Sequence, residues 1–116
     1  MLISASDMIA AAKSQCNCMD EVAAKLLFDK HDDAIILDVR EAEEFNQACL
    51  IDSTNIPRGL LELKIGDLCD NPNRVILIHC AGGGRASLAA STLQTMGYSN
   101  VHVIDSKFEE IRHVFG

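Results

Sequence analysis

The sequence predicts an α/β protein with a short, mostly parallel β-sheet that is flanked by helices on both faces. Three observations lead to this fold class. Short, fully apolar runs alternate with longer segments of helical periodicity. These runs lack the in–out alternation of half-exposed strands, which is typical of strands buried on both faces. Hydrophobic residues make up 48% of the 116 residues, enough for a core without disulfide or metal staples.

Two helices are expected at the amino-terminal end. Residues 7–14 predict a short helix that Ser6 or Asp7 caps at its start. Residues 20–30 predict a second, amphipathic helix with acids in its first turn, where negative charge suits the helix dipole. Its apolar face is expected to consist of Val22, Leu26 and Leu27.

The middle of the chain is expected to form a buried strand, a short helix, a second strand and another helix. Residues 34–37 (AIIL) are apolar throughout, which favours a strand inside the sheet. An acidic helix over 41–48 follows, and then a short strand over 53–56 that Pro57 ends. Residues 58–69 carry leucine and isoleucine at helical spacing and predict a further helix.

The carboxyl-terminal part repeats the order of strand and helix twice. Residues 75–78 (VILI) give the strongest strand prediction, and residues 86–96 predict a helix that Gly97 stops. Residues 101–104 are expected to form a strand and residues 107–115 a final helix. Strands that alternate with helices imply a mainly parallel sheet of about five strands.

The charge balance argues against two classes of partner. The formal net charge is −7, whereas nucleic acid and anionic membranes both need a basic face. No apolar run approaches the length that spans a bilayer. The amino terminus lacks the basic and continuously apolar regions of a signal peptide. We therefore expect a cytoplasmic location and neither nucleic acid nor a membrane as partner.

The five cysteines are expected to be free thiols. Their number is odd and no CxxC occurs, unlike the disulfide framework of a short secreted chain. Cys16 and Cys18 cannot complete a zinc site without further ligands, so no metal is expected. Cys69 is expected inside a helix core.

The segment after the strongest strand carries the chemistry. Cys80 stands at the strand end, glycines follow at 82–84, and Arg85 precedes a helix. Ligands of open α/β sheets bind at the carboxyl ends of the strands. Glycines let successive N–H groups turn inward, and the helix aims its positive end at the same point. These features predict a nucleophilic thiolate at Cys80, with Arg85 as the loop's only full positive charge.

The number of residues between Cys80 and Arg85 indicates which anion the loop binds. Four residues separate Cys80 from Arg85, whereas cysteine phosphatases place five between their Cys and Arg. The shorter ring of N–H groups should suit a terminal sulfur better than a tetrahedral phosphate. The small loop side chains also predict that the thiol is open to a bulky partner. The expected substrate-binding residues are Ala81, Gly82, Gly83, Gly84, Arg85 and Ala86.

Several blocks of the sequence resemble the rhodanese-like family. CAGGGRAS (80–87) is similar to the family's active-site loop, and AIILDVREAEEF (34–45) to its first conserved block. NIPRGLLE (55–62) is similar to its Asn-Ile-Pro block, and LQTMGYSNVHVID (93–105) to its last helix-to-strand passage. The resemblance covers about residues 19–111, almost the whole chain.

The resemblance implies a rhodanese-like three-layer fold, with Cys80 as catalytic residue and Asp38 and Arg40 as structural residues near the site. We expect a single domain over 1–116, in which 1–18 form an extra helix and strand segment before a family-like core at 19–111.

The chain departs from the family pattern at two places. Residues 48–53 lack the usual Gly-His-Ile and Gly-Ala, and Ser106 and Lys107 replace a usual Gly-Gly, while Ile111 replaces a usual Trp. These positions lie outside the loop, so they are expected to affect the pocket rim and the partner surface.

The implied activity is that of a thiosulfate or persulfide sulfurtransferase. Cys80 would take sulfur from a small donor, carry it as a persulfide and pass it to a thiol or cyanide; a protein donor or acceptor also fits. No cofactor is implied. Two alternatives stay open: a non-enzymatic binding or regulatory module, and, disfavoured by the spacing, a cysteine phosphatase or arsenate reductase.

Thiosulfate is expected to be a usable but poor donor. A site selective for this dianion should supply more than one cation, yet the loop offers Arg85 alone. The net charge of −7 should also repel a dianion. The opposite outcome, a cationic mouth, would require Arg40, Arg58 or Lys107 to fold in beside the loop.

Overall fold

The computed structural model describes residues 1–116 and contains one five-stranded sheet whose strands are all parallel. The predicted α/β class is therefore confirmed. The strands are β1 (Asn17–Met19), β2 (Ile35–Asp38), β3 (Ser53–Asn55), β4 (Ile76–His79) and β5 (Val101–Ile104). The helices are α1 (Ala5–Gln15), α2 (Glu21–Lys30), α3 (Ala42–Gln47), α4 (Leu61–Leu68), α5 (Gly84–Met96) and α6 (Phe108–Phe115), with a 3-10 turn at Arg58–Leu60.

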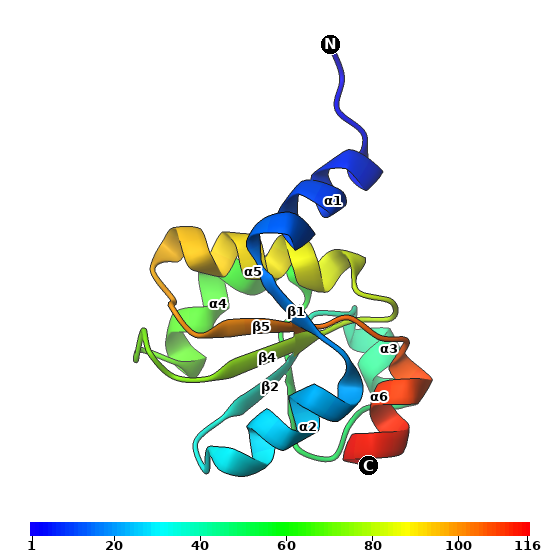
Figure 1. The fold of residues 1–116 in the computed structure, drawn as a ribbon, viewed down its shortest axis with the longest axis vertical. Coiled ribbons are helices and arrows are strands. Elements are labelled where there is room, and N and C mark those ends of the chain that lie inside the picture. Colours follow the sequence, from blue (N-terminus) through cyan, green and yellow to red (C-terminus); the bar gives the residue numbers. More distant parts are fainter.

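The strand order is β1-β5-β4-β2-β3, and helices cover both faces of this sheet. Helices α4 and α5 lie on one face, with α1 running across α5, whereas α2 and α6 lie on the other face (Figure 1). One apolar cluster joins β2 and β4 to α4 and α5, and a second joins the opposite side of these strands to α2 and α6. The result is the predicted three-layer arrangement.

The register of the two central strands decides where the polar residues meet. Ile35 pairs with Ile76 and Asp38 with His79, so β2 and β4 end side by side. Because parallel strands present their carboxyl ends at one edge, the segments after Asp38 and after His79 enter the same region. All residues of both strands are buried, as the apolar runs predict.

The face of α2 that packs on the protein differs from the prediction. Val22 and Leu26 are 56% and 58% exposed, and the buried residue is Ala24, with Leu27 and Phe28 partly buried beside it. The expected apolar face of Val22, Leu26 and Leu27 is therefore wrong for two of its three members. Ala24 belongs to the same apolar cluster as Ile36 and Leu77 of the sheet, so the side of α2 that carries this alanine faces the sheet.

Three further features differ from the sequence-based expectation. Helix α1 begins at Ala5, and its cap is Ser4, whose hydroxyl accepts from the Asp7 N–H at 3.1 Å, so the expected cap at Ser6 or Asp7 is wrong. The expected helix over 58–69 is divided into the 3-10 turn and α4. Helix α5 begins at Gly84 rather than at residue 86, so Arg85 lies in its first turn and not in the loop. None of the helices combines the length and the apolarity that a membrane-crossing helix needs.

Candidate functional site

The sulfur of Cys80 lies where β4 ends and the chain turns toward α5. Its Sγ accepts hydrogen bonds from the backbone N–H groups of Gly83, at 3.1 Å, and Ala86, at 3.4 Å. Ala86 belongs to the first turn of α5, so the positive end of this helix also faces the sulfur. Amide donors and a helix N-terminus together favour an anionic sulfur at this position.

The thiol is less open than the small loop side chains predict. Cys80 is only 2% exposed, although the neighbouring Ala81 and Gly82 are exposed. The expectation that a bulky partner reaches the thiol directly is therefore wrong. The physical reason is that the loop folds back and its own backbone covers Sγ.

Gly83 gives the loop its shape. Its φ of +101° lies in the left-handed region that other residues rarely adopt, and a Cβ there would overlap the carboxylate of Asp105. The carbonyl of Gly83 accepts hydrogen bonds from the hydroxyl of Ser87, at 2.6 Å, and from its backbone N–H, at 3.0 Å. These contacts hold Gly83 in place from its carbonyl side, while its own N–H donates to the sulfur of Cys80.

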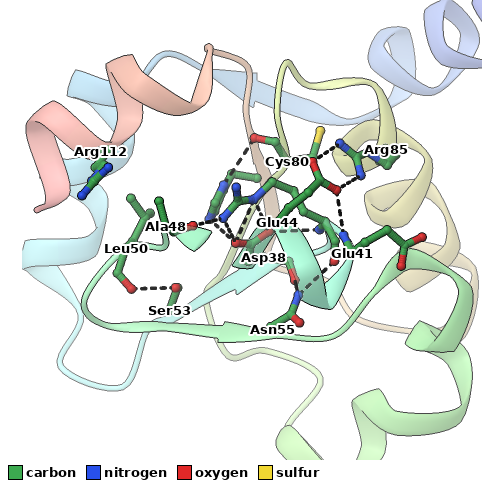
Figure 2. A network of polar contacts seen from close by, with 12 residues as sticks. Asp38, Glu41, Glu44, Ala48, Leu50, Ser53, Asn55, Cys80, Arg85 and Arg112 are labelled. Atoms are coloured by element: carbon green, nitrogen blue, oxygen red, sulfur yellow. Dashed lines mark hydrogen bonds and ion pairs between the residues drawn. The ribbon is translucent and has the colours of Figure 1, made fainter. Parts of the chain in front are cut away.

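The charge of Arg85 is matched by Glu44, a residue that the sequence did not single out. The two side chains form a two-pronged ion pair, with N–O distances of 2.6 and 3.2 Å, beside Cys80 (Figure 2). The hydrogen bond from Arg85 is the main cause that lowers the pKa of Glu44 to about 2, and the same contact raises the pKa of Arg85. The acidic α3 segment directly after Asp38-x-Arg40 was the signal that could have indicated this partner.

Asp38 and Arg40 form a buried ion pair beneath the site. The guanidinium of Arg40 donates to Asp38 at 2.8 to 3.1 Å and to the carbonyl of Ala48 at 2.7 Å. It also lies over the ring of Phe108, 4.0 Å from the ring centroid. The side chain of Asn55 donates to the backbone carbonyls of Asp38 and Arg40, so the pair joins β2, β3 and α6.

His79 belongs to this buried network and not to the thiol loop. It is fully buried, its ring stacks on Phe108, and its Nε2 lies 3.7 Å from Asp38 without a hydrogen-bond partner. Burial lowers the pKa of His79, against a smaller opposing effect of Asp38. The imidazole is therefore neutral at physiological pH.

The remaining cysteines are all free thiols, as expected. Cys69 is buried at the end of α4, and its Sγ is 3.3 Å from the carbonyl of Asn71. Cys16 and Cys18 are partly buried near α1 and α5, and burial is the main cause that raises the pKa of both. Cys49 is partly buried in the segment after α3.

Two of the three basic residues that could make the mouth of the site cationic are paired with other groups, whereas Lys107 directly precedes Phe108, whose backbone N–H donates to the Ala81 carbonyl of the loop at 3.0 Å. Arg40 is buried on Asp38, and Arg58 lies against Glu62, with N–O distances of 3.2 and 3.4 Å, and against the Thr92 hydroxyl at 2.9 Å. Neither Arg40 nor Arg58 therefore supplies the second free cation that a cationic mouth would require.

Fold and loop together define a class: a three-layer α/β protein in which two backbone N–H groups hold a cysteine sulfur at the end of a central parallel strand. The sequence model of the rhodanese-like domain family matches residues 20–113. The chain belongs to this family, which confirms the resemblance that the sequence blocks indicate.

Relatives with sulfur-related descriptions share only part of their length with this chain. YrkF of Bacillus subtilis, named as a sulfur carrier protein, is 37% identical over 79 residues, which are 68% of this chain and 42% of YrkF. A protein of Schizosaccharomyces pombe, named as a mitochondrial thiosulfate sulfurtransferase, is 29% identical over 58% of this chain and 55% of its own. The chain thus spans about half the length of these two relatives.

A solved structure from Rhodopseudomonas palustris matches nearly the whole chain. It is 27% identical, with a TM-score of 0.82, and the match covers 97% of this chain and 92% of the other. That protein is described as of unknown function, with tyrosine phosphatase as a suggested activity.

Proposed function

We propose that this protein is a sulfurtransferase that carries sulfur as a persulfide on Cys80. The observation that carries the proposal is the pair of backbone hydrogen bonds from Gly83 and Ala86 to the Sγ atom. These donors stabilise a negatively charged sulfur without a side-chain base.

The reaction has two displacement steps on sulfur. The Cys80 thiolate attacks the outer sulfur of the donor, a new S–S bond forms, and the donor's own bond to that sulfur breaks. The bonding electron pair leaves with sulfite from thiosulfate, or with a thiolate from an organic persulfide. A thiol or cyanide acceptor then attacks the outer sulfur of the Cys80 persulfide, and the Cys80 thiolate leaves.

The burial of Cys80 fits the second step. Because the thiol is only 2% exposed, the sulfur to be transferred must extend outward from it into the loop mouth. A persulfide adds one atom in that direction, so an acceptor meets the outer sulfur before it meets Sγ. The loop then shields the inner sulfur and directs the attack to the transferable atom.

The charges around the loop favour an organic persulfide over thiosulfate as donor. Arg85, the cation of the active-site segment, is already bound to Glu44 at 2.6 Å. A dianion that approaches this ion pair meets a carboxylate as well as a guanidinium, and the chain's net charge of −7 opposes its approach. An organic persulfide whose other groups are uncharged carries at most one negative charge, so it is less affected.

Intact-mass measurement after incubation with glutathione persulfide or thiosulfate tests the proposal. The expected product gains one sulfur atom on Cys80, and addition of cyanide removes it. Cys80→Ser should gain none, whereas Cys49→Ser, which changes a partly buried thiol outside the loop, should behave as wild type. A Cys80→Ser variant that still transfers sulfur to cyanide would refute the mechanism.

Two alternatives predict other outcomes of the same assay. A binding or regulatory module would gain no sulfur and form no thiocyanate, even with Cys80 intact. A phosphatase, the activity suggested for the Rhodopseudomonas palustris protein, would hydrolyse an aryl phosphate without sulfur transfer. The four-residue spacing between Cys80 and Arg85 favours sulfur over phosphate.

A further inference from the structure

The amino-terminal segment that precedes the matched family region touches the active-site loop. The family match begins at residue 20, yet α1 lies across α5 on the side of the sheet that carries Cys80 (Figure 1). Ile9 of α1 comes close to the start of α5, directly after the loop: its Cδ1 lies 3.1 Å from the place where a Cβ on Gly84 would stand. An element outside the matched region therefore forms part of the wall behind the loop.

An ion pair at the end of α1 reaches the peptide that binds the sulfur. Lys13 Nζ lies 3.1 Å from Asp105 Oδ1, and Asp105 directly follows β5. The Asp105 carboxylate occupies the space that a Cβ on Gly83 would need, and Lys13 Nζ is 3.6 Å from the same place. Gly83 is the residue whose N–H donates to the Cys80 sulfur.

The signs of these two charges have opposite consequences for an anionic sulfur. A carboxylate beside the Gly83 peptide opposes negative charge on Cys80, whereas an ammonium group stabilises it. The neighbouring Cys18 thiol responds to both charges: after burial, Asp105 raises the pKa of Cys18 and Lys13 lowers it. Lys13 thus offsets a carboxylate that the loop geometry holds close to the sulfur site.

We propose that Lys13 and Asp105 are positioning residues for the sulfur site: their ion pair fastens α1 to the Gly83 peptide and balances the charge behind the loop. The proposal rests on the proposed function, because the group that they position is the sulfur-carrying Cys80. Under this proposal, the amino-terminal segment contributes to the site through Lys13.

Single and double substitutions distinguish an effect of charge on the Cys80 sulfur from mechanical support of the loop by α1. The readout is the rate constant for alkylation of Cys80 by iodoacetamide between pH 5 and 10, followed on the Cys80 peptide by mass spectrometry. At pH 7, Lys13→Gln should slow alkylation about threefold, and Asp105→Asn should accelerate it about threefold. The double variant should return to within about twofold of wild type, and Lys13→Arg should match wild type.

The matched control is Lys25→Gln. Lys25 pairs with Asp29 at 2.8 Å on α2, with a side-chain exposure of 33% against 35% for Lys13, and α2 covers the other face of the sheet. This control makes the same change of net charge and should leave Cys80 alkylation unchanged. An equal effect of Lys25→Gln would mean that only the overall charge matters and would overturn the proposal.

Other outcomes also decide the question. Shifts in the same direction for Lys13→Gln and Asp105→Asn, or no shift in either, would show that the pair does not balance charge at the sulfur. Far-ultraviolet circular dichroism of each variant identifies any loss of fold, and Lys13→Arg then tests the site in a folded chain. Since alkylation requires no sulfur donor, opposite shifts in a protein that transfers no sulfur would refute the proposed function and leave this inference standing.

Discussion

Two arginine–carboxylate pairs lie at the same edge of the sheet, and they differ chiefly in their burial. Arg40 and Asp38 are 6% and 0% exposed, whereas Arg85 and Glu44 are 37% and 35% exposed. The N–O distances are similar, 2.8 Å in the buried pair and 2.6 Å in the open one. The same two kinds of charged group, at similar distances, therefore lie in two different environments.

The surroundings give the two pairs different roles. Arg40 also binds the Ala48 carbonyl and lies over Phe108, so its removal would leave Asp38 charged and unpaired inside the protein. Arg85 and Glu44 face water, where an ion pair contributes little stability but still sets the charge beside Cys80. The comparison indicates that the buried pair organises the fold, and we expect the open pair to affect the chemistry at Cys80.

The largest effect is expected from breaking the buried pair. Arg40→Met should lower the free energy of unfolding by about 3–5 kcal/mol, because Asp38 loses its only ion-pair arginine in a site without water access. Arg85→Met is the matched variant and should cost no more than about 1 kcal/mol. Urea denaturation followed by circular dichroism measures both. Equal losses would remove the distinction between the two pairs.

The surroundings of the buried pair and of the open pair should also differ in the pH range over which they affect stability. Burial lowers the pKa of His79, which lies 3.7 Å from Asp38. The folded chain therefore protonates His79 at a lower pH than the unfolded chain does. The contribution of His79 to stability is complete above the unfolded pKa of about 6.5 and is lost as the pH falls below it, by at most about 1.4 kcal/mol per pH unit.

The open pair should respond only at lower pH. The pKa of Glu44 is lowered to about 2, so its contribution is complete above the unfolded value of about 4.3 and is lost as the pH falls toward 2. Between pH 7 and 5, His79→Phe should therefore flatten the loss of stability, and Glu44→Gln should not change its slope. Urea titrations at several pH values test this, and an equal slope in His79→Phe and wild type would contradict it.

A smaller effect is expected on the donor preference. Glu44→Gln leaves Arg85 without its carboxylate, so the KM for thiosulfate should fall severalfold while kcat changes less. Glu43→Gln is the control, because Glu43 is exposed on the same helix and its replacement changes the net charge equally. If both variants lower the KM to the same extent, the ion pair with Arg85 does not govern thiosulfate binding.

The smallest expected effect concerns salt. The chain's net charge of −7 repels thiosulfate, and added salt screens that repulsion over a Debye length of roughly 8 Å at physiological ionic strength. The KM for thiosulfate should therefore improve about twofold between low and physiological salt. Steady-state kinetics at several ionic strengths measure it, and a KM that worsens with salt would indicate a cationic mouth and withdraw the preference for persulfide.

The strands and the sulfur loop could be predicted because each rests on local chemistry. The runs 34–37 and 75–78 contain only apolar residues, and such runs are stable only when both faces are covered. Gly83 adopts a positive φ, and glycine is the residue that does so without strain. The buried face of α2 could not be predicted in the same way, because it depends on which neighbour Ala24 packs against.

The sequence by itself determined the order of the elements, the family and the place of Cys80 at a strand end, since these depend on periodicity, on glycine and on short-range spacing. Only the tertiary structure decided which charges meet. Glu44 lies 41 residues from Arg85 and Lys13 lies 92 residues from Asp105, and packing brings each pair together. It also decided that Arg40 is buried and Arg85 is open, because burial arises from all the elements that surround a side chain.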